Sequence, residues 1–260
     1  MDILEKIIHT KKPQVERQKQ LVPVSVLEQS EFFNRQGFSL KTALQTPGAS
    51  GIIAEFKRKS PSKGYIKRDA DPVEITTGYA RAGASGLSVL TDMDFFGGDT
   101  TDLIQVRQNN KIPVLRKDFI FDEYQIIEAK SIGADLILLI AEVLTQKEIA
   151  RFVGLAHSLG LEVLMELHSE EQLEKIIPEI DLIGINNRNL KTFEVSLQNS
   201  IDLIGKLPPE FVFVSESGIR NPEDILMLKE YGFQGFLIGE SFMKTDNPPQ
   251  ACKNFIDSLR

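Results

Sequence analysis

The sequence predicts an α/β fold, a (β/α)8 TIM barrel with an N-terminal helical extension, and two observations carry this prediction. From Ile52 onward, a short apolar run is repeatedly followed by a polar loop, a segment with helical spacing and a glycine-containing turn. The apolar runs are continuous, which is typical of parallel strands covered on both faces. The rival is a doubly wound open sheet, but residues 57–64 contain neither glycine-rich motif that binds phosphate in such sheets.

Eight strands and the helices between them account for the chain after residue 50. The predicted strands are residues 51–56, 86–91, 113–117, 135–140, 162–167, 182–186, 211–215 and 235–239. Helical spacing is clearest over residues 72–82, 123–132, 146–159 and 222–231. Glycine, which adopts the left-handed conformation of a helix C-cap at little cost, follows them at Gly83, Gly133, Gly160 and Gly232. The repeat matches the β-α pairs of a closed barrel.

The first 50 residues lie outside this repeat. Residues 2–20 place apolar side chains on one face of a predicted helix. These side chains are Ile3, Leu4, Ile7, Ile8 and Val15. Residues 22–50 are predicted to form a second irregular or helical piece that contains the breaker Pro47-Gly48. We expect one domain overall, with an extension over residues 1–50 packed on a barrel over residues 51–260.

The composition is that of a globular protein with a full core. Of 260 residues, 42% are hydrophobic, and 37 acidic against 30 basic side chains give a net charge of −7. This balance gives no electrostatic reason to expect nucleic acid or an anionic membrane as a partner. No apolar run approaches the roughly 20 residues that a membrane span needs.

The single cysteine and the first residues favour the cytoplasm. Cys252 has no partner for an internal disulfide, which suits a reducing compartment. Residues 1–20 mix acidic and basic side chains and lack the apolar core of a signal peptide. We expect a soluble, cytoplasmic protein. We also expect a monomer, because no long apolar patch remains after the barrel helices are assigned.

Polar side chains gather at the carboxyl ends of the predicted strands, where a barrel of this kind places its active site. Side chains alternate along a strand, so Glu55 and Lys57 point the same way while Phe56 points the other way. The full polar set is Glu55, Lys57, Thr91, Asp92, Arg116, Lys117, Asp118, Glu142, Glu166, His168, Asn186, Arg188, Ser215, Glu216 and Ser217. We expect this rim to hold the chemistry.

Lys117 and Glu166 each end a buried apolar run, so they are candidates for a general acid and a general base. Lys57 would lower the pKa of Lys117 by repulsion, while Glu55 and Glu166 would oppose that change. The competing interpretation is that these residues form salt bridges that orient the loops. Convergence of all four on one pocket favours catalysis.

A phosphate site is expected after strands seven and eight, where barrels of this type often bind phosphate. Gly218 and Gly239 would let backbone N–H groups approach the anion, and Ser217 and Ser241 would add hydroxyl donors. Glu240 would contribute only its N–H, with its side chain pointing away. Serine and glycine at these points are otherwise ordinary turn residues.

The loop after the first strand is basic in an otherwise acidic chain. It carries Lys59, Lys63, Lys67 and Arg68. Either it is a solvated charge run, or it is a lid that attracts an anionic substrate and closes with Gly64 as a hinge.

No metal is expected, because the three histidines are scattered and no zinc-ligand spacing occurs. His168, beside Glu166, is a candidate for a minor role at the rim.

Six motifs in order resemble those of indole-3-glycerol-phosphate synthase. They are residues 54–62 (AEFKRKSPS), 89–92 with 95–98 (VLTD and FFGG), 115–119 (LRKDF), 164–166 (LME), 183–190 (IGINNRNL) and 215–219 (SESGI). The resemblance covers nearly the whole chain. It implies a barrel with its N-terminal segment over the active-site rim. It also implies a step of tryptophan biosynthesis that closes 1-(2-carboxyphenylamino)-1-deoxyribulose 5-phosphate to indole-3-glycerol phosphate, with loss of carbon dioxide and water.

The resemblance also implies roles for single residues. Lys117 matches the general acid of ring closure, Glu166 matches the base of the dehydration, and Lys57, paired with Glu55, matches a lysine near the substrate carboxylate. With Asn186 these form the catalytic set. The substrate-binding residues are Ser60, Phe119, Arg188 and Ser217, and the phosphate-binding residues are Gly218, Gly239, Glu240 and Ser241. No cofactor is expected, because decarboxylation itself restores the aromaticity that ring closure breaks.

Two other functions remain open from the residues alone. A Schiff-base aldolase would use Lys117 or Lys57 as a nucleophile toward a phosphorylated sugar. A non-catalytic barrel would bind a phosphorylated metabolite, but such a protein needs no acid-base pair. In every case the expected partner is a phosphorylated small molecule.

Overall fold

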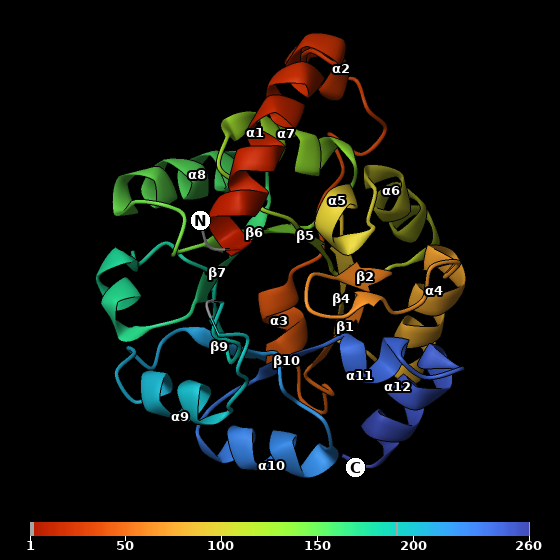
Figure 1. The fold of residues 1–260 in the computed structure, drawn as a ribbon, viewed down its shortest axis with the longest axis vertical. Helices are drawn as coiled ribbons and strands as arrows, with labels where there is room; N and C mark the ends of the chain where they lie inside the picture. The colour runs from red at the N-terminus through yellow and green to blue at the C-terminus, as the bar shows by residue number, and fades with distance from the viewer. Residues whose placement is uncertain (1–2, 191, 260) are drawn as a thin grey trace.

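The computed structural model describes residues 3–190 and 192–259 and shows a closed barrel of eight parallel strands (Figure 1). The strands are β1 (Ile52–Phe56), β4 (Gly86–Leu90), β5 (Val114–Lys117), β6 (Leu136–Ile140), β7 (Glu162–Leu167), β8 (Leu182–Asn186), β9 (Val212–Glu216) and β10 (Gly235–Ile238). Each pairs with the next along the chain, and β10 pairs with β1 to close the ring. The predicted (β/α)8 barrel is confirmed.

Strand ends differ from the prediction by a residue in several places. The predicted first strand includes Gly51, but this residue has a φ of 77° and precedes β1. A Cβ atom there would lie 2.6 Å from the carbonyl oxygen of Gln234, so only glycine fits. The seventh strand was predicted to end at Ser215, whereas β9 continues to Glu216. That extra residue matters for the site.

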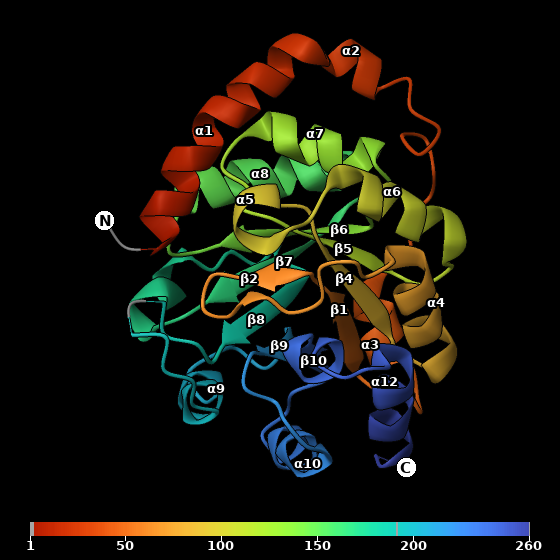
Figure 2. The same cartoon turned by 45° about the vertical axis from the view of Figure 1, so that its right-hand side comes forward.

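Helices follow the strands and cover the barrel (Figures 1 and 2). The helices after β1 are α4 (Pro72–Ala82), α5 (Met93–Phe96), α6 (Thr100–Asn109), α7 (Glu123–Ser131), α8 (Gln146–Ser158), α9 (Gln198–Ile204), α10 (Pro222–Glu230), α11 (Glu240–Met243) and α12 (Pro248–Asp257), with a 3-10 helix η1 (Glu170–Lys175) and a hairpin of β2 (Lys59–Ser60) and β3 (Gly64–Tyr65). Side-chain caps begin many of them, as at Asp71 and Thr145. Gly83, Gly133, Gly160 and Gly232 all have positive φ, as predicted. Across the described ranges, none of the helices has the length and apolar character needed to cross a membrane.

Alternation along the strands divides the buried side chains into two layers. Ile53, Leu115, Leu164, Leu182 and Val214 belong to one cluster, which fills the inside of the barrel. Their neighbours belong to a larger cluster between the strands and the helices. Two residues further along three of these strands, on the same inner face, stand Glu55, Lys117 and Glu166. The inner layer therefore changes from apolar to charged at the carboxyl ends.

The chain before β1 reaches both ends of the barrel. It forms α1 (Ile3–Leu21), α2 (Val24–Leu27) and α3 (Leu40–Gln45), and Figure 2 shows α1 crossing beside α7. Leu4 of α1 and Leu40 of α3 both pack into the inner cluster. Leu40 lies against Gly86, where β4 begins, so α3 closes the amino end while α1 lies at the carboxyl end. Residues 1 and 2 of the predicted extension, and residues 191 and 260 of the predicted barrel, lie outside the described residues.

Candidate active site

A cavity of about 260 Å³ opens at the carboxyl ends of the strands. Every residue with a predicted catalytic, substrate-binding or phosphate-binding role lines it. These residues are Glu55, Lys57, Ser60, Lys117, Phe119, Glu166, Asn186, Arg188, Ser217, Gly218, Gly239, Glu240 and Ser241. Ile3, Leu4 and Ile7 of α1 complete the wall. Residues separated by more than 180 positions in sequence thus meet in one pocket.

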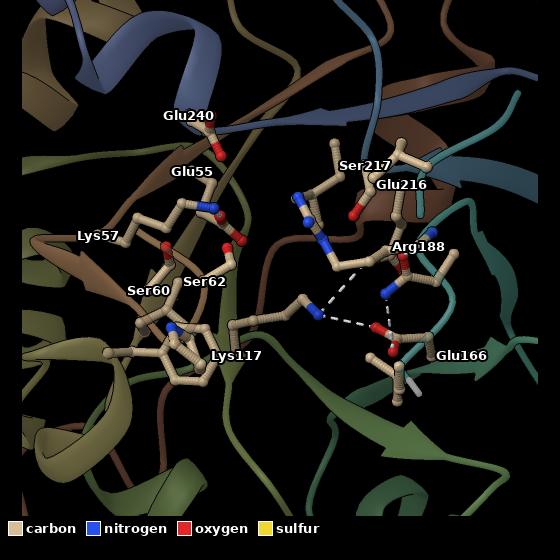
Figure 3. A pocket seen from close by; sticks show the side chains of 18 of the residues that line it. Glu55, Lys57, Ser60, Ser62, Lys117, Glu166, Arg188, Glu216, Ser217 and Glu240 are labelled. Carbon is tan, nitrogen blue, oxygen red and sulfur yellow. Dashed lines mark hydrogen bonds and ion pairs between the residues drawn. The ribbon is translucent and has the colours of Figure 1, made fainter. Parts of the chain in front are cut away.

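Lys117 stands at the centre of the cavity between two carboxylates (Figure 3). Its Nζ lies 2.8 Å from Glu166 Oε2 and 3.3 Å from Glu216 Oε2. The side chains are 14%, 3% and 2% exposed respectively, so water screens these charges poorly. Gly184 of β8 leaves the room that the Glu216 carboxyl group occupies.

This arrangement decides the protonation of each group. Burial would lower the pKa of Lys117, but the negative charge of Glu166, joined by that of Glu216 wherever Glu216 is ionised and by that of Glu55, outweighs burial and raises it. Burial would raise the pKa of Glu166, but Lys117 and His168 hold it well below the ordinary value. Burial raises the pKa of Glu216 to about 8, helped by repulsion from Glu166 and opposed by Lys117. At neutral pH this cluster of three side chains thus contains the Lys117 ammonium, the Glu166 carboxylate and a protonated Glu216 carboxyl group.

Glu55 and Lys57 form a second pair on the inner face of β1, as their spacing predicts. Lys57 Nζ donates to Glu55 Oε1 at 2.7 Å. Ser88 of β4 donates to the other carboxylate oxygen at 3.4 Å. Gly239 packs against this carboxylate, since a Cβ atom at that position would lie 2.5 Å from Glu55 Oε1. Gly239 has a φ of −125°, so this close approach, and not its backbone conformation, is what requires glycine.

Two neighbours orient Glu166. Asn186 Nδ2 donates to Glu166 Oε1 at 3.2 Å. His168 Nε2 lies 3.1 Å from the same oxygen, within ion-pair distance but outside hydrogen-bond geometry. Both partners favour the carboxylate form, which is the form that a general base needs.

The loops after β9 and β10 form the wall predicted to bind phosphate. Ser217 and Gly218 both have positive φ, 66° and 82°, and a left-handed serine costs about 1–3 kcal/mol that surrounding contacts must offset. Asn187 Nδ2 donates to the Ser217 carbonyl oxygen at 3.0 Å and helps to hold this turn. Ser241 Oγ donates to the Ile219 carbonyl oxygen at 3.0 Å, so it ties the two loops together.

The opposite wall is apolar and aromatic. The rings of Phe96 and Phe119 lie 5.9 Å apart, and both residues line the cavity. Ser60 also lines the cavity, and its buried Oγ has no hydrogen-bond partner among the described residues. Such an atom is costly unless a ligand or water satisfies it. Arg188 reaches into the same space from the loop after β8 (Figure 3).

Part of the predicted polar rim lies outside the cavity lining. The residues concerned are Thr91, Asp92, Arg116, Glu142, His168 and Ser215. Arg116 shows the reason, because it alternates with Lys117 and points between the strands and helices, where its Nη2 lies 2.6 Å from Glu128 of α7. Strand alternation sends neighbouring residues to opposite faces.

Glu216 carries no predicted role, yet it contacts Lys117. The signal was present in the sequence, because Glu216 follows Val212 and Val214 at a spacing of two and so shares the inner face. The predicted end of this strand at Ser215 leaves Glu216 outside the strand and so gives its side chain no inward direction. Lys11 of α1 was also missed; it is buried against Asp92 and Asp118, and no local pattern in the sequence pairs it with them.

The basic loop after β1 is anchored to its surroundings. Lys59 Nζ donates to the Asp94 carbonyl oxygen at 2.6 Å, and Lys67 Nζ donates to the Thr245 carbonyl oxygen at 3.0 Å. Lys63 lies 3.3 Å from Glu240 Oε1, so the Glu240 carboxylate has a cationic partner at the cavity edge. These contacts join the loop to α5, to α11 and to Thr245 after α11, which is more than a freely solvated charge run would show.

A second hollow, of about 990 Å³, lies at the amino end of the barrel. It is larger, but its charged lining residues are Lys111 and Lys229, with no carboxylate to form an acid-base pair. The candidate acid-base groups therefore lie in the first cavity. Among residues 3–190 and 192–259, no three His, Cys, Asp or Glu side chains are grouped to hold a metal ion.

Comparison with known proteins agrees with this geometry. The family model for indole-3-glycerol phosphate synthase matches residues 4–255. The synthase of that name from Bacteroides thetaiotaomicron is 50% identical over 259 residues, covering 100% of this chain and 99% of the relative, and the one from Lachnoclostridium phytofermentans is 42% identical, covering 97% and 98%. A chain of the tryptophan synthase a2b2 complex from Pyrococcus furiosus shares the fold, with a TM-score of 0.61 and 14% identity over 81% of this chain and 98% of that one. The chain belongs to the indole-3-glycerol phosphate synthase family.

Proposed function

We propose that this cavity performs the reaction of the family, the closure of 1-(2-carboxyphenylamino)-1-deoxyribulose 5-phosphate to indole-3-glycerol phosphate with release of carbon dioxide and water. Membership of a family of indole-3-glycerol phosphate synthases supports this assignment. The observation that carries it is the buried Lys117 ammonium in contact with the Glu166 carboxylate, between an aromatic wall and two serine-glycine loops. This is an acid and a base placed beside sites for a ring and a phosphate.

In the first step, the aromatic carbon that bears the carboxylate attacks the ketone carbon of the substrate. A carbon–carbon bond forms while the carbonyl oxygen gains negative charge. Lys117 stabilises this charge and donates a proton to give a hydroxyl group. Because the pKa of Lys117 is raised, it holds that proton at neutral pH.

Decarboxylation then restores the aromatic ring. The bond to the carboxylate breaks, carbon dioxide leaves, and its electron pair returns to the ring. Loss of the new hydroxyl group as water requires an acid to protonate it and a base to remove a proton from the substrate. Glu166 is suited to be that base, since it is ionised and held by Asn186, and Lys57 beside Glu55 is the candidate acid.

Each part of the substrate has a matching wall. The phosphate fits the loops that contain Ser217, Gly218, Gly239, Glu240 and Ser241, where positive φ and tight glycine packing allow close backbone approach. The ring fits against Phe119. Substrate hydroxyl or carboxylate oxygens would satisfy Ser60 Oγ and the guanidinium of Arg188.

The raised pKa of Lys117 argues against the Schiff-base aldolase, because an amine nucleophile must first lose its proton. Lys57 is likewise bound to Glu55 as an ion pair. A non-catalytic binder would leave the buried cluster of Lys117, Glu166 and Glu216 without a function that offsets the cost of burying these charges.

We further infer a monomeric chain and a cytoplasmic location, both from the sequence properties above.

The test follows indole fluorescence after the substrate is mixed with the wild-type chain, Lys117→Ala and Glu166→Gln. Removal of a general acid or base should lower kcat by about 100-fold to 10,000-fold. Lys147→Ala, an exposed lysine on α8, is the matched control and should retain wild-type turnover. Absence of fluorescence with folded wild-type protein, or trapping of a lysine adduct by borohydride, would reject the assignment.

A further inference from the structure

Lys11 occupies an unusual position on α1. The buried face of this helix consists of Leu4, Ile7, Lys11 and Val15, so a lysine stands where the spacing predicts an apolar residue. Lys11 is 7% exposed. A buried ammonium is costly unless opposite charges replace the lost water.

Two carboxylates form ion pairs with the Lys11 ammonium in place of water. Lys11 Nζ lies 2.7 Å from Asp118 Oδ1 and 3.1 Å from Asp92 Oδ2. Burial alone would lower the pKa of Lys11, but attraction to Asp118 and Asp92 outweighs it and raises the pKa. Lys11 therefore keeps its proton at neutral pH.

Each carboxylate belongs to a segment that forms the aromatic wall. Asp118 stands between Lys117 and Phe119, and its Oδ1 also accepts from the Phe119 backbone N–H at 2.7 Å. Asp92 is the N-cap of α5, the short helix that carries Phe96. The Phe96 and Phe119 rings contact each other across these two segments. Asp92 and Asp118 thus set where the two rings stand.

Lys11 itself lies outside the cavity lining, whereas Ile7, one turn earlier on α1, is part of it. The ammonium therefore joins three segments, α1, α5 and the chain after β5, at a point behind the wall. Arg116 Nη2 also lies 3.2 Å from Asp118 Oδ2, so loss of the Lys11 ammonium would leave Asp118 with one cation but would remove the contact that ties Asp118 to Asp92.

We propose that Lys11 is a positioning residue for ring closure, holding the aromatic wall and the Lys117–Phe119 segment so that the substrate ring lies beside the acid. The inference rests on the proposed function. Lys11 touches no reacting atom and acts through Asp92 and Asp118.

A second cation on the same helix supplies a matched control. Lys19 Nζ lies 2.6 Å from Asp122 Oδ2, the N-cap residue of α7, which does not line the cavity. Lys19 therefore helps to dock α1 without bridging the aromatic wall. The Lys19 side chain is 31% exposed against 9% for Lys11, so Lys19→Met tests whether loosening α1 at a second, more exposed point is enough to affect the reaction.

The experiment measures steady-state kinetics of wild type, Lys11→Met, Lys11→Arg and Lys19→Met with the carboxyphenylamino substrate. Lys11→Met should lower kcat/KM by about tenfold to a hundredfold, mainly through a higher KM, because a small displacement of a positioning group has effects of this order. Lys11→Arg should recover most of the loss, and Lys19→Met should stay within about twofold of wild type. Inhibition by inorganic phosphate should be unchanged in Lys11→Met, since the phosphate loops follow β9 and β10.

The proposal is overturned if Lys11→Met has wild-type kinetics or if Lys19→Met loses as much kcat/KM as Lys11→Met. It is also overturned if inhibition by phosphate weakens in Lys11→Met to the same extent that KM rises. Inactive wild-type protein would instead refute the proposed function, so the two failures are distinguishable. If Lys11→Met does not fold, Asp92→Asn provides the test, because asparagine can still cap the Phe95 N–H while the charge facing Lys11 is lost. A KM unchanged in Asp92→Asn would then overturn the proposal.

Discussion

Glu216 allows a quantitative test of the electrostatics inside the cavity. The whole residue is 1% exposed, and burial and the charge of Glu166 raise the pKa of its carboxyl group to about 8 from an ordinary value of 4.5. One of its oxygens has no hydrogen-bond partner among the described residues. Replacement by glutamine keeps the shape of the side chain and removes its titration.

The sign of the effect follows from proton binding. The unfolded chain releases the Glu216 proton near pH 4.5, whereas the folded protein keeps it up to a pH of about 8. Between these values the folded state holds one proton more, so its stability falls as pH rises. One proton corresponds to about 1.4 kcal/mol per pH unit, or about 5 kcal/mol over the whole interval.

The assay is urea unfolding of wild type and Glu216→Gln at several pH values between about 5 and about 9. The free energy of unfolding of the variant, minus that of wild type, should increase by about 1.4 kcal/mol per pH unit and level off above a pH of about 8. Glu230→Gln, an exposed carboxylate at the end of α10, controls for the loss of one acidic side chain. A difference that is flat or decreases with pH would refute the raised pKa of Glu216.

Three further predictions concern other parts of the molecule. Gly239→Ala should lower kcat/KM by at least about tenfold, because the new methyl group would displace the Glu55 carboxylate that Gly239 contacts; wild-type kinetics would show that this contact is not needed. His168→Leu should move the acidic limb of the kcat profile to higher pH, since His168 helps to lower the pKa of Glu166, and an unmoved limb would count against that contact. Leu40→Ala should lower the free energy of unfolding by about 2–5 kcal/mol in urea, because Leu40 is 1% exposed and fills the amino end of the barrel; a loss below about 1 kcal/mol would contradict that role.

Much of the fold could be predicted because its signals are local. Strand alternation, helical spacing and glycine at helix ends are each set by neighbours within a few residues, and they predict a barrel that the structure confirms. The same alternation predicts that Glu55 and Lys57 share a face, and they form an ion pair. The predicted end of the seventh strand, Ser215, lies one residue before the observed end of β9, so the prediction does not include the inward direction of the Glu216 side chain.

The protonation of the cavity could not be predicted, because it depends on distances between strands. The sequence left open whether Lys57 or the carboxylates dominate the pKa of Lys117, and the answer required Glu166 and Glu216 to be placed within 3.3 Å of its Nζ. Coulomb energies change steeply over such distances in a buried site. Closure of the barrel is what brings these three strands together.

The sequence by itself determined the class of fold, the rim at which polar residues gather and the types of group available for acid-base chemistry, since all of these follow from local spacing and residue chemistry. Only the tertiary structure decided which of the rim residues enter the cavity, and that Lys11, from a helix outside the repeat, lies 2.7 Å from Asp118. The physical reason is that a contact between residues 107 positions apart is set by the packing of whole elements, and no local pattern in the chain encodes that packing.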